Sequence, residues 1–312
     1  YMCGIAGAYG WVDDDALGEM IDCLRHRGPD DDGIFVNRDG PVMMGMRRLS
    51  IVDIEGGAQP IINEDGTVRV VFNGEIYNHE SLRDDLKSKG HRLSTQSDTE
   101  VLVHLWEEYG ERMPELLNGM FAFAIWDADQ ECVFLARDRL GIKPLYYANL
   151  GDRFVWGSEI QSILATGVDR TLDEAAVYNY FSLHYSPWPQ TLFRSVNKLE
   201  PGTSICVDRS GVSHRRYWNF SPDQVKGSRD AVADRLLDHL RTSVDRRMMA
   251  DVPVGAFLSG GLDSSTVVGL MSELREDIQT FSVAFTDEAN DESEEARFVA
   301  EEFGPDHHAP LV

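Results

Sequence analysis

Met2-Cys3-Gly4-Ile5-Ala6-Gly7 is the N-terminal stretch around which the rest of the chain is organised. If the residues before Cys3 are removed, Cys3 carries both a thiol nucleophile and a free α-amine that can accept its proton. A thiol titrates near ~8.5 and an α-amine near ~7.7 to 8.0, so a modest local perturbation gives a thiolate beside a proton carrier at neutral pH. Acyl transfer requires such an activated nucleophile. Taken alone, a cysteine at this place also fits a small buried hydrophobe.

Outward from this stretch, hydrophobic periodicity predicts an α+β domain over 3–210. The small and apolar residues of 4–9 predict a short strand buried on both faces. Closely spaced strands separated by turn residues indicate an antiparallel sheet, with helices in blocks and no βαβ alternation. The predicted helices span 13–25, 79–89, 99–109 and 172–183, and the other predicted strands span 42–53, 68–72, 119–127, 132–137, 144–148, 153–158 and 202–207, the last strand of this domain.

Three polar positions in this domain are candidates for a site. Arg48 lies in an otherwise apolar strand, and such an arginine usually holds a carboxylate, either of the protein or of a ligand. Asn73-Gly74 is a turn dipeptide first of all, but at a strand end it can also present an amide side chain and a backbone N–H to one point, as an oxyanion hole requires. Asp98 directly precedes a predicted helix, so we expect it to act first as an N-cap.

The charge of the chain excludes some partners. The formal net charge is −24, and the basic residues are nearly all arginine. Nucleic acids and anionic membranes both require a basic surface, so neither is an expected partner. Strong acidity with scarce lysine is also typical of proteins from high-salt cytoplasms, where salt screens self-repulsion, and it predicts a halophilic source.

The sequence also predicts a cytoplasmic protein without a metal site formed by cysteines. No apolar run approaches the ~18 to 20 residues that cross a bilayer, and no secretory signal pattern is present. His307 and His308 are neighbours in a predicted strand and would point to opposite faces, so no metal ligand is assigned to them. Neither a disulfide framework nor a zinc site is expected, because the cysteines are far apart and form no C-x-x-C pair: Cys3, Cys23, Cys132 and Cys206.

A polar linker over 211–227 separates this domain from a second one over 228–312, where the pattern changes. A helix over 230–249 is followed by a strand over 252–258, the loop Ser259-Gly260-Gly261-Leu262-Asp263-Ser264-Ser265, a helix to 274, a strand over 280–285 and a helix over 293–303. This order is typical of the start of a parallel α/β domain. The loop lacks the Walker A spacing, but its backbone N–H groups and its serine hydroxyls at a helix N-terminus predict phosphate binding. Asp263 could hold Mg²⁺ or a polar ligand group.

Several motifs of the first domain together resemble the class II, Ntn-type glutamine amidotransferases. These motifs are Cys3-Gly4-Ile5, Arg27-Gly28-Pro29-Asp30, Arg48-Leu49-Ser50-Ile51-Val52-Asp53, Asn73-Gly74-Glu75-Ile76-Tyr77-Asn78 and Ser97-Asp98-Thr99-Glu100. The second domain resembles the ATP-pyrophosphatase domain, and the two in this order resemble the glutamine-hydrolysing asparagine synthetases. The resemblance implies an Ntn-hydrolase sandwich followed by a parallel α/β ATP-pyrophosphatase domain.

The resemblance also implies roles for individual residues. Cys3 would attack the side-chain amide of glutamine and form a thioester, while Asn73 and the N–H of Gly74 stabilise the oxyanion. Arg48 would hold the α-carboxylate of glutamine, and Asp98 and Glu75 would hold its α-amine and nearby polar groups. The backbone of Leu49, Ser50, Ile51 and Val52 would line the pocket.

In the second domain the resemblance implies that ATP activates aspartate as β-aspartyl-AMP, which ammonia from the first site converts to asparagine. Mg²⁺ and a homodimer are also implied. The ATP-binding residues would be Leu258, Ser259, Gly260, Gly261, Asp263, Ser264, Ser265 and Val283.

Two departures from the family's pattern leave alternatives open. Tyr1 and Met2 precede Cys3, and the α-amine is lost if they stay attached. The chain stops at Val312, before the later segments that would complete the ATP and aspartate sites, so a truncated second domain is expected. The amide acceptor is therefore open. The alternatives are a paralogue that amidates another carboxylate or closes a ring, as β-lactam synthetases do, and a catalytically silent scaffold module.

Overall fold

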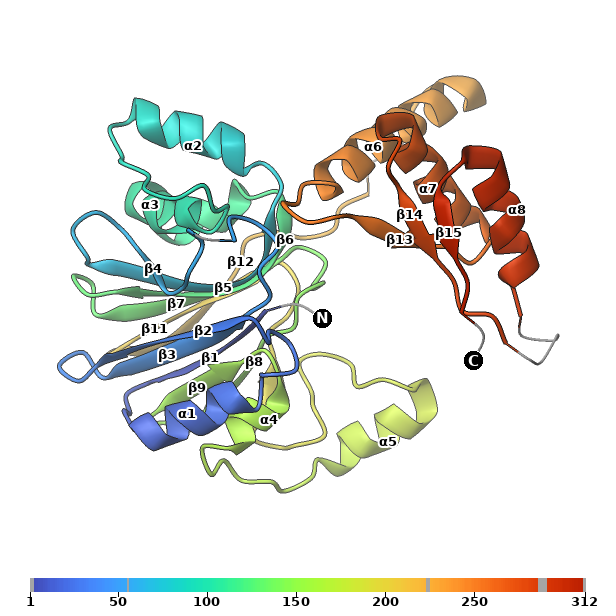
Figure 1. Ribbon diagram of the computed structural model, residues 1–312. Coiled ribbons are helices and arrows are strands. Elements are labelled where there is room, and N and C mark those ends of the chain that lie inside the picture. The colour runs from blue at the N-terminus through green and yellow to red at the C-terminus, as the bar shows by residue number, and fades with distance from the viewer. Residues whose placement is uncertain (1–2, 55, 223–224, 286–290, 311–312) are drawn as a thin grey trace. The chain divides into compact units, whose positions relative to one another are not determined.

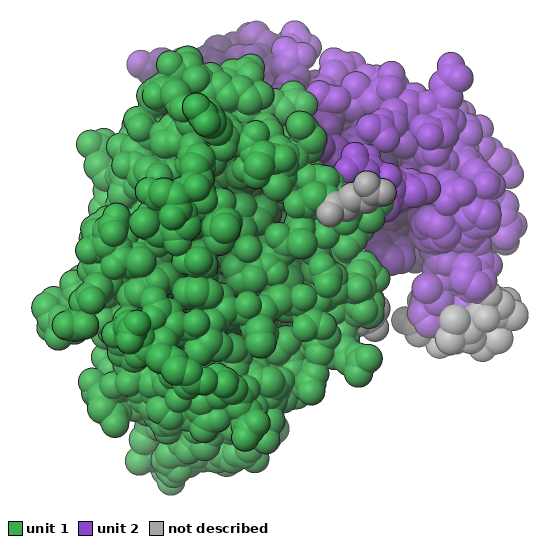
Figure 2. Space-filling model, turned by 60° about the vertical axis from the view of Figure 1, so that its left-hand side comes forward, with its two compact units in different colours: residues 1–220 green, residues 221–312 purple. Residues whose placement is uncertain are grey.

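The computed structural model describes residues 3–54, 56–222, 225–285 and 291–310 and divides the chain into two compact units. Unit 1 ends at Phe220 and unit 2 begins at Ser221 (Figures 1 and 2). The predicted linker over 211–227 therefore begins too early. Gly211–Arg216 forms strand β12, which pairs with β11 (Thr203–Asp208), because the short turn between them closes a hairpin.

Unit 1 contains two antiparallel six-stranded sheets. The first has the order β10-β8-β9-β1-β3-β2 and consists of β1 (Gly4–Tyr9), β2 (Asp31–Asn37), β3 (Val42–Arg48), β8 (Tyr146–Asn149), β9 (Phe154–Gly157) and β10 (Asn197–Lys198). The second has the order β12-β11-β7-β6-β5-β4 and adds β4 (Ile61–Ile62), β5 (Val68–Ile76), β6 (Gly119–Asp127) and β7 (Cys132–Arg137).

The sheets pack face to face between two helical layers, which gives a four-layer α+β sandwich (Figure 1). Residues of both sheets, such as Met44 and Trp126, form the core between them. The outer face of the first sheet is covered by α1 (Asp14–Asp22) and α4 (Ile160–Leu164). The outer face of the second is covered by α2 (His79–Ser88) and α3 (Glu100–Tyr109). A 3₁₀ helix (Gly110–Glu115) and α5 (Glu174–Leu183) complete unit 1.

Local signals set most of these boundaries. The side chain of Asp13 accepts a hydrogen bond from the Ala16 N–H (3.0 Å) and caps α1, as the acidic start of the predicted helix indicates. The predicted strand over 42–53 is too long, because β3 ends at Arg48 and the guanidinium group of Arg48 folds the next residues into a loop. The strand predicted over 68–72 is too short, because β5 stays paired with β6 as far as Ile76.

Gly7 lies in the middle of β1, where no side chain fits. A Cβ atom there would lie 2.3 Å from a ring carbon of the buried Trp156 and 2.5 Å from the Met43 carbonyl oxygen. We expect Gly7→Ala to lower the free energy of unfolding by about 1–3 kcal/mol, measured by denaturant titration. Gly18→Ala is the matched control, since Gly18 lies on the exposed face of α1 and a Cβ atom there would have nothing within 4 Å. It should raise stability by up to about 1 kcal/mol. Equal denaturation midpoints for Gly7→Ala and the parent would contradict the close packing of β1 against Trp156 and Met43.

Unit 2 contains a parallel three-stranded sheet of order β13-β14-β15, as the predicted parallel α/β pattern requires. The elements are α6 (Arg229–Arg247), β13 (Gly255–Phe257), α7 (Leu262–Leu274), β14 (Gln279–Phe281), α8 (Ser293–Phe303) and β15 (Asp306–His308). Among the described residues of both units, no helix is long and apolar enough to span a membrane.

Candidate active site

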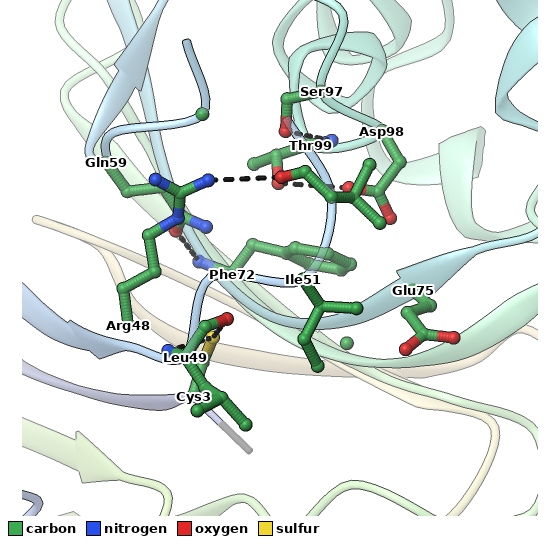
Figure 3. Close-up of a pocket in the computed structure, with 13 residues that line it drawn as sticks. Cys3, Arg48, Leu49, Ile51, Gln59, Phe72, Glu75, Ser97, Asp98 and Thr99 are labelled. Atoms are coloured by element: carbon green, nitrogen blue, oxygen red, sulfur yellow. Dashed lines mark hydrogen bonds between the residues drawn. The ribbon is translucent and has the colours of Figure 1, made fainter. Parts of the chain in front are cut away.

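A pocket in unit 1 gathers residues from the start of β1, the end of β5 and two loops (Figure 3). The loops are those after β3 and before α3. The lining residues are Cys3, Arg48, Leu49, Ile51, Val52, Gly57, Gln59, Phe72, Gly74, Glu75, Ser97, Asp98 and Thr99.

The thiol of Cys3 forms one end of this pocket. Its Sγ atom lies 3.4 Å from the Leu49 nitrogen, which donates to it, and 3.7 Å from the Leu49 carbonyl oxygen. Burial raises the pKa of the Cys3 thiol, and the Leu49 N–H and the charge of Arg48 only partly oppose this. The thiol is therefore neutral at neutral pH and needs a base to become a nucleophile. Tyr1 and Met2, on which the predicted α-amine base depends, lie outside the described residues.

The Arg27-Gly28-Pro29-Asp30 segment holds the surroundings of Cys3 in place. Arg27 Nε donates to the Cys3 carbonyl oxygen (3.0 Å), and Asp30 Oδ2 accepts from the Ser50 N–H (2.9 Å). Gly28 is required, because a Cβ atom there would lie 2.5 Å from the backbone between Arg47 and Arg48. This segment, which the sequence alone does not distinguish from a charged loop, therefore fixes both the nucleophile and the loop after β3.

The N–H group of Gly74 faces the pocket. In an antiparallel strand, alternate residues direct their N–H groups to opposite sides. Phe72 donates to Gln59 Oε1 (2.7 Å) and Ile76 donates to Asp98 Oδ2 (2.8 Å), both on the side of β5 away from β6. Gly74 is the alternate residue between Phe72 and Ile76, so its N–H also points to the side of β5 away from β6. A Cβ atom at Gly74 would lie 2.2 Å from the Met120 carbonyl oxygen, so only glycine fits here.

The side-chain amide of Asn73 is buried and has no hydrogen-bond partner among the described residues. Its side chain is fully buried, and within the described part of the chain neither Oδ1 nor Nδ2 has a hydrogen bond. It points to the other face of β5 from Phe72 and Gly74, into the core between the sheets against which Cys3 also packs, although the lining of the pocket does not include it. An unpaired buried amide costs about 1–3 kcal/mol, so this position is a candidate for bonding to a group that enters the site.

Arg48 forms the buried wall of the pocket and supports the loop after β3. Its guanidinium group donates to the carbonyl oxygens of Val52 (3.1 Å), Asp53 (2.6 Å) and Ile54 (3.1 Å). These bonds to described residues go to backbone carbonyls, not to the protein carboxylate that was one predicted alternative. They use three of the five donors of an arginine, so a ligand carboxylate can still be bound.

Asp98 is buried and faces β5. The prediction that it caps the helix over 99–109 is wrong: Thr99 occupies the N-cap position, and Asp98 accepts from the Ile76 N–H instead. Burial raises the pKa of Asp98 to about 7, and the nearby charge of Glu75 adds to the rise. Asp98 therefore changes charge near neutral pH.

The pocket contains most of the residues that the sequence predicts and five that it does not. Ser50 is outside the lining, because its N–H is turned to Asp30. The residues missed are Gly57, Gln59, Phe72, Ser97 and Thr99. Ser97 and Thr99 flank Asp98 in its motif and could have been included. Gln59 has no such signal, because its role depends on a hydrogen bond from Phe72, which is distant in sequence and lies in β5.

In unit 2, the predicted loop is shorter than expected: Ser259, Gly260 and Gly261 connect the carboxyl end of β13 to α7, and Leu262–Ser265 already form the first turn of α7. Ser259 Oγ and Ser264 Oγ lie 3.0 Å apart, and Gly260 adopts a φ of +74°. Of the predicted residues, only Leu258, Ser259 and Val283 line the adjacent pocket, together with Phe257, Phe281, Ser282, Phe285 and Glu292. Gly260, Gly261, Asp263, Ser264 and Ser265 lie outside its lining.

Comparison with protein families agrees with the geometry of both units. The family model described as "Glutamine amidotransferase domain" matches residues 2–218. The chain belongs to this family. The model described as "Asparagine synthase" matches residues 235–312, in unit 2. Asparagine synthetases [glutamine-hydrolyzing] 1 and 3 of Bacillus subtilis are 38% and 35% identical to this chain, and the matches cover the whole of it.

The fold of this chain is also found in a solved structure. The glutamine phosphoribosylpyrophosphate amidotransferase of B. subtilis matches with a TM-score of 0.53 and 18% identity, over 98% of this chain and 65% of the other. The predicted Ntn-hydrolase sandwich is confirmed. The chain spans about half the length of the two B. subtilis synthetases, of which 50% and 54% are covered.

Proposed function

We propose that unit 1 hydrolyses glutamine at Cys3 and that the whole protein is a glutamine-dependent asparagine synthetase. The observation that carries the first part is the position of the Cys3 thiol in a pocket that the Gly74 N–H also faces. The names of the relatives at 35–38% identity support the second part. The products would be asparagine, glutamate, AMP and pyrophosphate, in a cytoplasmic and homodimeric enzyme.

The proposed reaction begins with proton transfer from the thiol to the α-amine of Cys3. Sγ then attacks the carboxamide carbon of glutamine, and the carbonyl oxygen becomes an oxyanion. The Gly74 N–H and the unpaired amide of Asn73 would donate to this oxygen. The C–N bond breaks as the α-ammonium returns its proton to the leaving nitrogen, which departs as ammonia. Water hydrolyses the thioester to glutamate and restores the thiol.

Three charged residues would orient the substrate in this reaction. The remaining donors of Arg48 would bind the α-carboxylate of glutamine, and Asp98 with Glu75 would bind its α-ammonium group. Arg48 and Asp98 are both buried, which strengthens these charge pairs relative to pairs in water. Leu49, Ile51 and Val52 would shape the pocket around the side chain.

Unit 2 would supply the ATP site. The Ser259–Ser265 segment lies at the carboxyl end of a parallel strand and includes the first turn of α7, and phosphates bind at such helix N-termini in these folds. A Cβ at Gly260 would lie 2.8 Å from the Ala296 nitrogen, so glycine keeps the loop close to α8. Asp263 offers an exposed carboxylate in the first turn of α7, and its oxygens fit Mg²⁺. Mg²⁺ held there would neutralise charge on the phosphates of ATP.

The test is glutamine hydrolysis by protein whose intact mass shows Cys3 as the first residue. We expect equimolar ammonia and glutamate, and no turnover by protein that retains Met2, because its Cys3 nitrogen is an amide. No turnover by protein that begins at Cys3 would favour the silent scaffold. A paralogue with another acceptor would hydrolyse glutamine but form no asparagine from aspartate and ATP in the full-length protein.

The raised pKa of Asp98 predicts how glutamine binding depends on pH. Its carboxyl group is neutral below pH about 7 and cannot pair with the substrate's α-ammonium. We therefore expect KM for glutamine to rise as pH falls from about 8 to 6. Asp98→Asn, which preserves shape, should give a high KM that no longer depends on pH in this range. A flat KM for the parent would contradict the assigned role of Asp98.

A further inference from the structure

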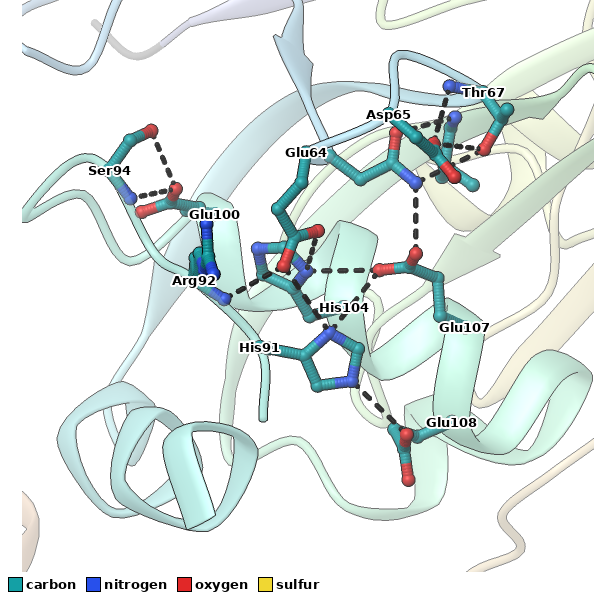
Figure 4. Close-up of polar contacts among 12 residues, drawn as sticks. Glu64, Asp65, Thr67, His91, Arg92, Ser94, Glu100, His104, Glu107 and Glu108 are labelled. Atoms are coloured by element: carbon teal, nitrogen blue, oxygen red, sulfur yellow. Dashed lines mark hydrogen bonds and ion pairs between the residues drawn. The ribbon is translucent and has the colours of Figure 1, made fainter. Parts of the chain in front are cut away.

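A cluster of two histidines and two glutamates lies on the α2–α3 side of unit 1, outside the glutamine pocket (Figure 4). Glu64 precedes β5, His91 follows α2, and His104 and Glu107 lie one turn apart on α3. One donor atom from each of these residues lies within 4.8 Å of all the others. Three chain segments therefore converge on one point.

The spacing of the donor atoms fits one small cation. His104 Nδ1 lies 3.0 Å from Glu107 Oε2 and 3.4 Å from Glu64 Oε2. His91 Nδ1 lies 3.7 Å from Glu107 Oε2 and 3.8 Å from Glu64 Oε1. A tetrahedral ion with ligands at about 2.0–2.2 Å separates its donors by about 3.4 Å, so small side-chain movements would be enough to bind it.

Hydrogen bonds from outside the cluster orient three of the four side chains. The second ring nitrogen of His91, Nε2, lies 3.1 Å from Glu108 Oε1, which is the carboxylate–histidine arrangement found behind metal ligands. Asn63 Nδ2 donates to Glu107 Oε1 (2.9 Å), and the Arg92 N–H donates to Glu64 Oε1 (2.8 Å). Glu107 thus keeps its Oε2 atom directed at both histidines, and Glu64 keeps its Oε2 atom directed at His104.

His104 supplies an independent indication. Only 1% of its side chain is exposed, and its Nδ1 faces the carboxylates of both Glu64 and Glu107. The cluster therefore offers two imidazole nitrogens and two carboxylate oxygens to one point, a donor set that suits a divalent cation.

We propose that Glu64, His91, His104 and Glu107 bind a divalent transition-metal ion, with zinc as the best fit. Two imidazole nitrogens and two carboxylate oxygens suit zinc, whereas Mg²⁺ and Ca²⁺ prefer oxygen ligands alone. Four protein ligands make a closed, structural site. The ion would tie the start of β5 and the end of α2 to α3 and so stabilise the elements that carry Gly74 and Asp98. Spacing along the chain does not reveal the site, because its ligands come from three segments.

The test is calorimetric titration of the 312-residue chain with Zn²⁺ alone. Both parent and variants carry Cys3→Ala, so that the pocket thiol does not bind the probe. We expect one equivalent of Zn²⁺ to bind and to raise Tm, and excess Mg²⁺ not to compete. His91→Ala and Glu107→Gln should each weaken zinc binding at least about 10-fold. Co²⁺ in place of Zn²⁺ should give the visible absorption of a tetrahedral complex.

His26→Ala is the matched control, because His26 also pairs with a glutamate, Glu159 (2.9 Å), but outside the cluster. It should bind zinc as the parent does. Equal zinc affinity in the parent, His91→Ala and Glu107→Gln would overturn the proposal, as would the absence of saturable binding in the parent. If His91→Ala lowers Tm without metal, the near-isosteric Glu107→Gln decides between lost ligation and lost folding.

Discussion

Cys3→Ala is expected to lower the rate of glutamine hydrolysis at least about 10⁴-fold, because a nucleophile that forms a covalent intermediate has no substitute. The hydrogen bonds to its Sγ atom are long contacts with Leu49, at 3.4 Å and 3.7 Å, so the fold should lose little. The measurement is ammonia release from protein processed to residue 3, with Tm recorded in parallel.

Cys23→Ala is the control for this substitution. Cys23 is a partly exposed thiol at the C-terminal end of α1, and the pocket lining does not include it. Its loss should leave glutamine hydrolysis unchanged. If the Cys3→Ala protein retains activity within about tenfold of the parent, Cys3 is not the nucleophile.

Asn73→Ala is expected to lower kcat for glutamine by about 10²–10³-fold with little change in KM, because an oxyanion donor acts mainly in the transition state. Since the Asn73 amide has no protein partner among the described residues, no internal hydrogen bond is lost. Tm should therefore change by only a few degrees. Steady-state kinetics and thermal unfolding of the same samples separate the two effects.

Asn78, in the same Asn73–Asn78 motif, gives the opposite expectation. Its side chain donates to the Leu116 carbonyl oxygen (3.0 Å) and accepts from the Asn118 N–H (2.8 Å), so it joins two segments outside the pocket. Asn78→Ala should lower Tm and leave kcat nearly unchanged. If Asn73→Ala raised KM instead of lowering kcat, Asn73 would be a ground-state binding residue.

Much of the fold was predictable where burial produces a clear pattern. The strand over 4–9 is β1, fully buried, and the helix over 293–303 is α8. Strand β2 was missed, because it lies at a sheet edge, begins Asp31-Asp32-Gly33 and exposes much of its length. The strand over 202–207 is not the last of unit 1, since the equally exposed β12 follows it.

The sequence by itself determined the chemistry available at the site: a thiol, an arginine, an amide followed by glycine, and an acid, each in a short motif whose internal spacing does not depend on the rest of the fold. Only the tertiary structure decided how these groups are used. The register of β5 with β6 directs the Gly74 N–H to the side where Gln59 and Asp98 bind its neighbours. Burial gives Asp98 a pKa of about 7, and chain reversals bring His91 to His104. These properties depend on contacts between residues distant in sequence and on the exclusion of water. Neither the contacts nor the exclusion of water exists before the chain has folded.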